Sequence, residues 1–202
     1  MKEFDAVILA NGAFPTADEP LRLLREARYV VCCDGAARHW PQCDAIVGDG
    51  DSVPDELRSR LIQIDEQEDN DLTKATRYCL SKGMRRIAYL GATGKREDHT
   101  LGNISLMARY AQELGVEPLL ATDEGWFVVA EGEVVFNSFQ GQQVSIFNIS
   151  CKTLSSDGLR WQAYPYHQLW QGTLNEALSN RFVLRGDGCY MVYRTYPPKG
   201  IT

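Results

Sequence analysis

The sequence predicts an α/β N-terminal domain with a parallel, Rossmann-like sheet, followed by an all-β C-terminal sandwich. Three observations predict this fold class. First, 44% of the 202 residues are hydrophobic, which is enough to bury a substantial core. Second, apolar runs alternate with helical patterns in the first part of the chain, and each run leads into a loop that contains Gly or Asp. Third, short strands separated by turn signals follow from about residue 124. We expect domains over residues 1–123 and 124–202.

The predicted parallel sheet begins with the apolar run 4–10, which is typical of a strand buried on both faces. Apolar residues at helical spacing then predict a helix over 20–28, and the run 29–33 predicts a second buried strand that ends at Asp34. The same alternation continues along the chain. Further strands are predicted at 45–47, 61–64, 86–90 and 118–122, with helices between Asp71 and Gly83 and over 101–114.

The C-terminal domain is predicted from short apolar strands and the turns between them. Glu131–Gly132 and Gly186–Gly188 have the composition of turns, and no convincing helical pattern lies between the strands. This pattern favours antiparallel pairing in a small sandwich or barrel. The predicted strands are 126–130, 133–136, 143–147, 182–184 and 189–193.

Charge and cysteine spacing argue against several classes of protein. A net charge of −6 argues against a nucleic-acid surface, which would present a basic face. The N-terminus carries acids where a signal peptide needs a basic and then apolar start, and no apolar run approaches the length of a membrane span. The six cysteines show no CxxC spacing, so we expect reduced core residues. We therefore expect a cytoplasmic protein that binds neither nucleic acid nor a membrane.

The stretch Gly48–Ser52 follows a buried run and offers two carboxylates, Asp49 and Asp51, one residue apart. Open α/β folds bind their ligands at the carboxyl ends of the strands, where these two side chains are expected. Paired carboxylates favour a hard cation, and Mg²⁺ is the usual one when the substrate also brings phosphates. The alternative is an ordinary turn, because Gly, Asp and Ser are all turn formers.

A second acidic stretch carries five carboxylates within residues 65–71. Asp71 is the expected N-cap of the following helix, and acids at a helix start also complement its dipole. Five carboxylates exceed that need, and a cation would relieve their repulsion. Lys74 lies one turn into the helix, where we expect it either to meet a phosphate or to lie exposed on the surface.

The loop 91–100 follows a predicted strand and precedes a helix. It is not a Walker A loop, because Tyr89 and Arg96 stand where that motif needs Gly and Ser or Thr. Its small residues nevertheless allow backbone N–H groups to approach phosphate oxygens, and Arg96 can bind a phosphate with two hydrogen bonds. Asp98 lies at the helix start, and packing there is the preferred interpretation of His99 from the residues alone.

Taken in order, these motifs resemble the thiamine pyrophosphokinase family, also called thiamin diphosphokinase. The resemblance covers nearly the whole chain, and the ordered set is far more specific than any one motif. The matching motifs are Ala10–Gly12, Asp34–Ala36, Gly48–Ser52, Asn70–Lys74, Gly91–Gly94 with Arg96, Asp98, His99 and Thr100, and then Gly158–Trp161 and Ser179–Asn180.

The resemblance implies an ATP- and Mg²⁺-binding catalytic domain over 1–123, and a thiamine-binding and dimerisation sandwich over 124–202. It implies a homodimer whose active site lies at the subunit interface. It also implies the reaction, in which the thiamine hydroxyl attacks the β-phosphorus of the co-substrate ATP, so that thiamine diphosphate forms and AMP leaves.

The resemblance further implies roles for individual residues. Asp49, Asp51, Asp71 and Asp98 would be catalytic and would hold Mg²⁺ together with Glu68. The residues expected to bind ATP and its phosphates are Asp34, Gly35, Lys74, Gly91, Thr93, Gly94, Arg96 and His99. Trp161, Ser179 and Asn180 would bind thiamine.

An indole is a suitable contact for thiamine, which is aromatic and cationic, because a cation over an indole contributes about 0.5 to 2 kcal/mol. The alternative for Trp161 is a place in the core of the sandwich. Two other functions remain open for the whole chain. One is a metal-dependent nucleotide pyrophosphohydrolase, in which water replaces the alcohol, and the other is a non-catalytic nucleotide- or thiamine-binding module. The full set of acidic and basic residues argues against a simple binding module.

Overall fold

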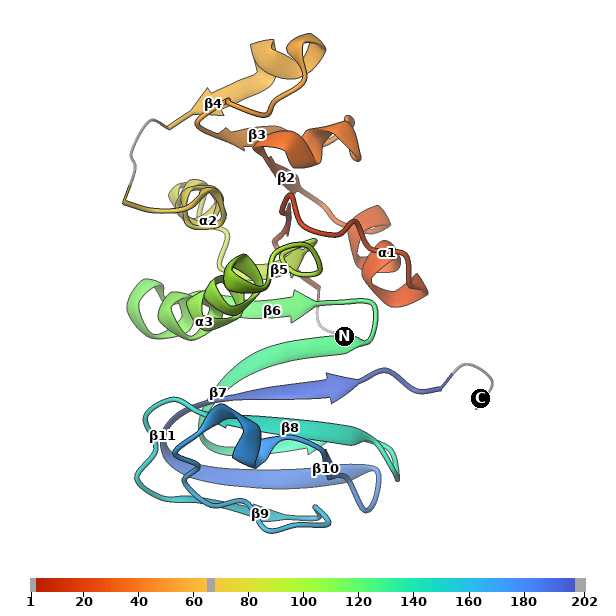
Figure 1. Ribbon diagram of the computed structural model, residues 1–202, viewed down its shortest axis with the longest axis vertical. Helices are drawn as coiled ribbons and strands as arrows, with labels where there is room; N and C mark the ends of the chain where they lie inside the picture. The colour runs from red at the N-terminus through yellow and green to blue at the C-terminus, as the bar shows by residue number, and fades with distance from the viewer. Residues whose placement is uncertain (1–2, 65–67, 199–202) are drawn as a thin grey trace. The chain divides into compact units, whose positions relative to one another are not determined.

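The computed structural model describes residues 3–64 and 68–198, and the chain divides into two compact units. Unit 1 is Met1–Asp123 and unit 2 is Glu124–Thr202 (Figure 1). Unit 1 is α/β and unit 2 is antiparallel β, so the predicted fold class is confirmed. Among the described residues, no helix combines the length and the apolar character needed to cross a membrane.

Unit 1 is built on a parallel sheet with the strand order β6-β5-β1-β2-β3-β4. Its short central strands are buried on both faces, which is why the sequence shows continuous apolar runs there rather than alternation. The strands are β1 (Ala6–Leu9), β2 (Val30–Cys33), β3 (Ala45–Gly48), β4 (Leu61–Gln63), β5 (Arg86–Leu90) and β6 (Glu117–Ala121).

The strand order places a topological switch point in the middle of the sheet. β1 pairs with β2 on one side and with β5 on the other. The chain adds β2, β3 and β4 in turn on one side of β1 and then returns to place β5 and β6 on the other side. Ligands of open α/β sheets bind outside the carboxyl ends of the strands at such a point. The loops after β1, β2, β3 and β5 all leave from this edge, and those after β2, β3 and β5 carry several of the predicted site residues.

The three α-helices of unit 1 each begin at an earlier residue than the sequence pattern predicts. α1 (Asp18–Arg25) packs against β5, α2 (Asp71–Ser81) against β1, β2 and β3, and α3 (Glu97–Leu114) against β6 (Figure 1). α3 begins four residues before the predicted start at Leu101, because its polar first turn carries no apolar periodicity. It ends at Gly115, which adopts a left-handed conformation with φ of 64°. Short 3₁₀ helices follow β2 and β3, at η1 (Asp34–Arg38) and η2 (Asp55–Arg60).

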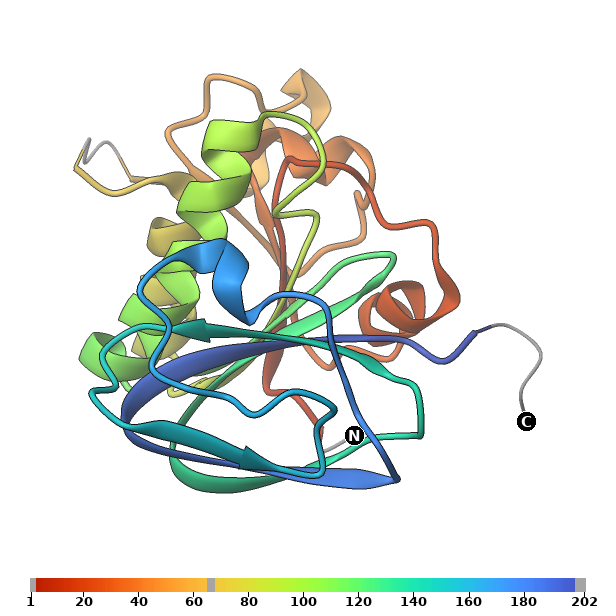
Figure 2. The same cartoon turned by 60° about the horizontal axis from the view of Figure 1, so that its bottom comes forward.

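Unit 2 is an antiparallel sheet with the order β10-β8-β11-β7, and β9 pairs with the first half of β11. β9 pairs with the first half of β11 and β8 with its second half, so the long strands contribute to two layers. Buried side chains from both halves of β11 form one hydrophobic core between these layers. The short helix η3 (Leu169–Gly172) packs against β8 (Figure 2). The strands are β7 (Gly125–Asn137), β8 (Gln143–Asn148), β9 (Leu154–Asp157), β10 (Asn175–Glu176) and β11 (Arg181–Thr195).

Two predicted turns of unit 2 are wrong. Glu131–Gly132 lies inside the continuous strand β7, although Gly132 has a φ of 73°. Gly186–Gly188 lies inside β11, where the pairing with β7 shifts register between Arg185 and Cys189. Glycines of this kind mark irregularities within long strands as often as chain reversals. The four short strands predicted at 126–130, 133–136, 182–184 and 189–193 are therefore parts of two long, bent strands, β7 and β11.

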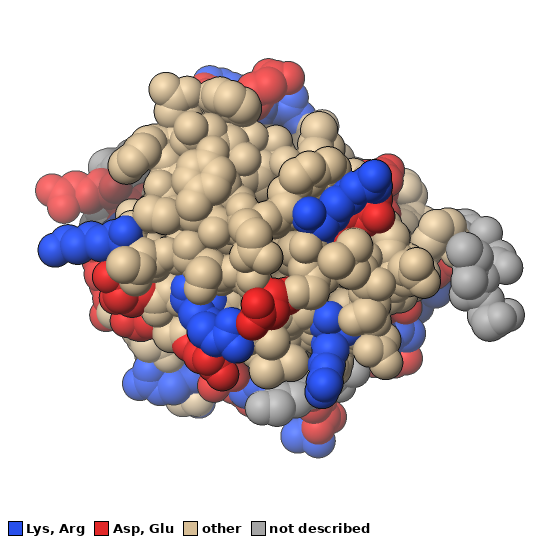
Figure 3. Space-filling view, turned by 90° about the horizontal axis from the view of Figure 1, so that it is seen from below, with Lys and Arg blue, Asp and Glu red and all other residues tan. Residues whose placement is uncertain are grey.

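The structure shows the burial of the cysteines and the distribution of charge on one face of the molecule. All six cysteines are buried and free, as expected for small apolar core residues. On the face seen in Figure 3, acidic and basic side chains lie side by side and leave a broad uncharged area in the upper part of the view. No continuous basic surface is present on that face.

Candidate active site

The carboxyl edge of the unit 1 sheet surrounds a cavity of about 520 Å³. Its walls come from the loops after β1, β3 and β5 and from the first turns of α2 and α3. Predicted and unpredicted residues meet there, and the polar ones among them are Asn11, Asp51, Ser52, Asn70, Asp71, Thr93, Lys95, Arg96, His99, Thr100 and Asn103.

Asp34, Asp49 and Asp51 form a three-carboxylate cluster beside this cavity, with one oxygen of each within 4.8 Å of the others. Asp34 follows β2, whereas Asp49 and Asp51 follow β3, so neighbouring parallel strands bring the three together. Sequence reasoning assigned Asp34 to ATP and did not group it with the other two. The signal was present, because Asp34 also follows a buried strand directly.

The backbone fixes the position of the Asp34 carboxylate. Its two oxygens accept the N–H of Gly50 at 3.1 and 3.2 Å, and Asp34 itself has an unusual positive φ of 36°. Ser52 supports the same loop, because its Oγ accepts the N–H of Gly35 at 3.1 Å. An added Cβ at Gly35 would lie 2.7 Å from Asn11 Nδ2, so a larger residue there would require the Asn11 side chain to shift.

Electrostatics distinguish the carboxylates of this edge. Burial, followed by the negative charge of Asp71, raises the pKa of Asp34 to about 6. The N–H of Asp51 donates to Asp49 Oδ1 at 3.2 Å and lowers the pKa of Asp49. Burial raises the pKa of Asp71 against the opposing charge of Lys74. Asp34 is buried, whereas Asp49 is half-buried and Asp51 is exposed. Like charges placed together around a buried carboxylate are costly unless a cation compensates them, so this donor set fits a hard divalent ion.

The sequence predicts Asp71 as the N-cap of α2, but Asp71 is the first residue of that helix. Asn70 is the cap, because its Oδ1 accepts the N–H of Thr73 at 3.0 Å. Lys74 is also not a surface lysine, since its side chain is only 4% exposed and its Nζ lies 3.5 Å from Asp71 Oδ1. The buried ammonium of Lys74 is therefore a fixed positive charge beside Asp71, which lines the cavity.

The acidic stretch before α2 behaves differently from the prediction. The buried carboxylate of Asp69 binds Arg77 at 2.7 Å and Arg109 at 3.2 Å, so arginines from α2 and α3 neutralise it. Glu68 is exposed and is absent from the three-carboxylate cluster. The rest of the predicted stretch, Asp65–Gln67, lies outside the described residues. The structure therefore does not bring Glu68 together with Asp49 and Asp51.

The loop after β5 is held tightly against the loop after β1. The N–H of Gly12 donates to the carbonyl of Gly91 at 2.6 Å, and the N–H of Ala13 donates to that of Thr93 at 2.8 Å. Gly91 and Gly94 have φ of 62° and 87°, which glycine adopts without strain. Lys95 Nζ, which had no predicted role, donates to the Asn11 carbonyl at 2.9 Å. This compact loop keeps its backbone close to the cavity.

Arg96 and Asp98 form an exposed ion pair with N–O distances of 2.6 and 3.1 Å. The guanidinium lowers the pKa of Asp98 to about 2. Asp98 is paired with Arg96 rather than grouped with the three-carboxylate cluster. His99 is exposed at the first turn of α3 and lines the cavity, and its N–H donates to Asp98 Oδ1 at 2.9 Å.

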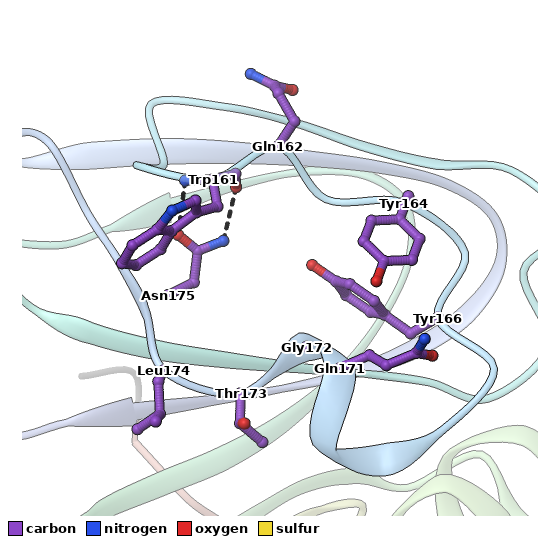
Figure 4. Close-up of a pocket in the computed structure, with 9 residues that line it drawn as sticks. All are labelled: Trp161, Gln162, Tyr164, Tyr166, Gln171, Gly172, Thr173, Leu174 and Asn175. Atoms are coloured by element: carbon purple, nitrogen blue, oxygen red, sulfur yellow. Dashed lines mark hydrogen bonds between the residues drawn. The ribbon is translucent and has the colours of Figure 1, made fainter.

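Trp161 lies in unit 2 and is 55% exposed, so it is not a core residue. It lines a separate pocket of about 350 Å³, where Figure 4 shows its indole on one side and Tyr164 and Tyr166 on the other. The buried Asn175 holds the Trp161 backbone at both ends, since its Oδ1 accepts the Trp161 N–H at 3.1 Å and its Nδ2 donates to the Trp161 carbonyl at 2.7 Å.

The structure does not bring the other predicted thiamine residues into this pocket. Ser179 and Asn180 are exposed in the turn before β11 and do not line it. Ser179 Oγ donates to the carbonyl of Arg181 at 3.0 Å, and the Asn180 carbonyl accepts the N–H of Ser138 at 2.9 Å. The pocket is instead completed by part of a segment that the sequence left without a role, Gln162–Ala177.

Comparisons with known proteins agree over nearly the whole chain. A family model of the thiamin pyrophosphokinase catalytic domain matches residues 21–117, and one of the thiamin pyrophosphokinase substrate-binding domain matches residues 125–193. No curated protein sequence matches the chain significantly.

Solved structures share the fold at low sequence identity. Thiamine pyrophosphokinase from Bacillus subtilis has a TM-score of 0.74 at 19% identity, covering 96% of this chain and 99% of the other. The enzyme from Candida albicans has a TM-score of 0.77 at 16% identity, with 96% and 90% covered. The yeast enzyme has a TM-score of 0.75 at 12% identity, with 96% and 87% covered.

Proposed function

Because the chain belongs to the thiamin pyrophosphokinase family, we propose that it transfers the pyrophosphoryl group of ATP to the hydroxyl of thiamine. A bond forms between the thiamine oxygen and the β-phosphorus, the bond from the β-phosphorus to the bridging oxygen of AMP breaks, and the hydroxyl proton is released. The products are thiamine diphosphate and AMP. The observation that carries this proposal is the match of both family domains, in order, along one chain.

We propose Asp34, Asp49 and Asp51 as the residues that hold Mg²⁺, with Asp71 beside them. The support is their geometry, since three carboxylate oxygens lie within 4.8 Å of one another at the edge of the cavity. When bound, the ion would neutralise charge on the polyphosphate. Asp98 and Glu68 remain candidates from the family resemblance alone, and for Asp98 a role as ligand would require it to leave Arg96.

The remaining residues of the cavity are suited to bind and orient the polyphosphate. Phosphoryl transfer asks a protein mainly for positioning and charge stabilisation. Lys74, which lies beside the cavity rather than among the residues that line it, supplies a buried positive charge, and Arg96 supplies an exposed guanidinium. The compact loop Gly91–Gly94 would contribute backbone N–H groups. Asp34 and Gly35 fix the loops on the other side of the cavity.

We propose that unit 1 is the catalytic domain and that unit 2 binds thiamine and forms a homodimer. The exposed indole of Trp161 supports this proposal, because a half-exposed tryptophan in an aromatic pocket is suited to stack on a cationic heteroaromatic ring. Ser179 and Asn180 would contribute only if the site includes more than this pocket. A cytoplasmic location is supported by the use of ATP and by six unpaired cysteines.

The dimer proposal has its own test. If the site is shared between subunits, heterodimers of an Asp51→Asn chain and a Trp161→Ala chain contain one intact site. Assayed at thiamine concentrations below KM, where the Trp161→Ala homodimer is several-fold less active than the wild type, these heterodimers should recover activity above the mean of the two parent homodimers. Absence of recovery from purified heterodimers would show that each site belongs to one chain.

The activity itself is tested by incubating the purified protein with ATP and Mg²⁺, with and without thiamine. AMP should form only when thiamine is present. AMP release of equal rate without thiamine would indicate a nucleotide pyrophosphohydrolase. Nucleotide binding without turnover would indicate a binding module.

A further inference from the structure

A chain of hydrogen bonds made by side chains runs along the wall of the unit 1 cavity. Asn103 Nδ2 donates to the carbonyl of Ala92 at 2.8 Å, and Asn103 Oδ1 accepts from Asn70 Nδ2 at 3.2 Å. Asn70 Oδ1 in turn accepts from the N–H and the Oγ1 of Thr73 at 3.0 and 2.9 Å. We call Ala92, Asn103, Asn70 and Thr73 the asparagine relay.

The relay joins the two parts of the cavity that are suited to bind phosphate. Ala92 belongs to the loop Gly91–Gly94, and Asn70 caps α2, whose first turn carries Asp71 and Lys74. Asn103 belongs to a third element, α3, and the hydrogen-bonded backbone of that helix fixes the position of its Cα. Ala92, Asn103 and Asn70 all line the cavity, so this connection runs along its wall.

Other contacts already hold α2 and α3 together. Thr73 Oγ1 and the hydroxyl of Tyr110 lie 2.7 Å apart in the buried interior. The buried carboxylate of Asp69 also binds Arg109 of α3 at 3.2 Å. The bond between Asn70 and Asn103 is exposed by comparison, and an exposed polar bond contributes little to folding because water replaces it readily. This hydrogen bond therefore matters more for the relative position of the two sides of the cavity than for the stability of the fold.

We propose that Asn103 is a positioning residue for the pyrophosphoryl transfer, acting through Ala92 on the phosphate-binding loop and through Asn70 on the start of α2. The proposal rests on the proposed function. A displacement of about 1 Å between groups that position a substrate can lower a rate by about a hundredfold. Loss of the relay should therefore affect catalysis much more than stability.

Three variants test the relay. Asn103→Ala removes both of its bonds. Asn70→Thr retains a good helix cap but removes the amide that donates to Asn103. The double variant tests whether the two residues act together. Gln112→Ala is the matched control, because it removes an exposed amide from the same helix outside the residues that line the cavity.

We expect Asn103→Ala to lower kcat about tenfold and to raise the KM for ATP, with the KM for thiamine and the Tm close to those of the wild type. Asn70→Thr should show a smaller loss in the same direction. The double variant should lose no more activity than Asn103→Ala alone, because Asn103→Ala already breaks the bond that Asn70→Thr removes. Gln112→Ala should match the wild type in all four quantities.

Wild-type kcat and KM for ATP in Asn103→Ala would overturn the inference, as would a loss that follows a lowered Tm. Independent, additive losses in the double variant would also contradict it. Calorimetric binding of a non-hydrolysable ATP analogue with Mg²⁺ separates this inference from the proposed function. If the wild type makes no thiamine diphosphate, the proposed function fails, and about tenfold weaker binding of the analogue to Asn103→Ala would still support the relay. Unchanged binding of the analogue to Asn103→Ala would then contradict the inference about Asn103.

Discussion

Both carboxylate oxygens of Asp34 accept the backbone N–H of Gly50, at 3.1 and 3.2 Å. This contact fastens the loop after β2 to the loop after β3 and so sets the spacing of the three-carboxylate cluster. The approach is close enough to require glycine in β3 as well, because an added Cβ at Gly48 would lie 2.2 Å from Asp34 Oδ1. The backbone as well as the side chains therefore determines this candidate metal site.

Gly48→Ala should displace the Asp34 carboxylate and lower activity by more than about tenfold, which corresponds to about 1.4 kcal/mol of barrier. Mg²⁺-dependent turnover and thermal unfolding measure the two effects. Gly102→Ala is the control, because an added Cβ there meets no atom within 4 Å and alanine favours a helix interior. Equal activity of the two variants would show that the position of Asp34 does not matter.

Asp34→Asn should raise the Tm in metal-free buffer at pH 7, because the ionised carboxylate is buried beside other acids. The sign follows from the pKa of Asp34, which is about 6 in the folded protein against an ordinary 3.8. Between these values the folded state binds the extra proton, so stability falls as pH rises through this window. The advantage of Asp34→Asn over the wild type should thus be full at pH 7 and small at pH 4.

Mg²⁺ should reverse this order at pH 7, because the wild type gains more from the cation than the variant does. Thermal unfolding with and without Mg²⁺ checks both statements. A metal-free Tm at pH 7 below that of the wild type, or an equal Mg²⁺ shift in both proteins, would argue against a cation at Asp34.

Asp51→Asn and Asp71→Asn should each lower turnover at least tenfold, or about 1.4 kcal/mol, while the fold is retained. Each change removes a negative charge without altering side-chain volume. Steady-state rates at saturating Mg²⁺ and circular dichroism provide the measurement. Near wild-type rates in both variants would remove these residues from the mechanism.

Trp161→Ala should raise the KM for thiamine by several-fold and leave the KM for ATP unchanged, since the groups that we propose bind phosphate all lie in unit 1. Its 55% exposure predicts only a small effect on stability. Trp161→Phe, which keeps an aromatic face, should recover part of the affinity. Equal increases in both KM values, or a large fall in Tm, would assign Trp161 a structural role.

The positions of the strands of unit 1 along the chain were predictable because buried parallel strands leave a direct signature, an apolar run followed by Gly or Asp. The grouping of side chains at the sheet edge was less so. Asp34 joins Asp49 and Asp51 only because β2 and β3 are neighbours. Asp98 binds Arg96 two residues away, a local contact that no spacing argument separates from metal binding.

Long strands and caps account for the other differences. Gly132 and Gly186 have the composition of turns, yet β7 and β11 continue through both positions, and the pairing of the two strands resumes after a register shift between Arg185 and Cys189. Asn70 and Asp71 are both good caps, and only the hydrogen bond from Thr73 to Asn70 decides between them. Lys74 is buried because the cavity edge supplies an acidic partner, Asp71, that the sequence alone does not place.

The identity of the spent nucleotide tests the central claim most directly, because attack at the β-phosphorus releases AMP whereas an ordinary kinase releases ADP. The purified protein is incubated with thiamine, Mg²⁺ and ATP, and nucleotides and thiamine esters are quantified together by chromatography. The account predicts one AMP for each thiamine diphosphate formed, with no ADP produced. Stoichiometric ADP, with thiamine monophosphate as the product, would contradict it.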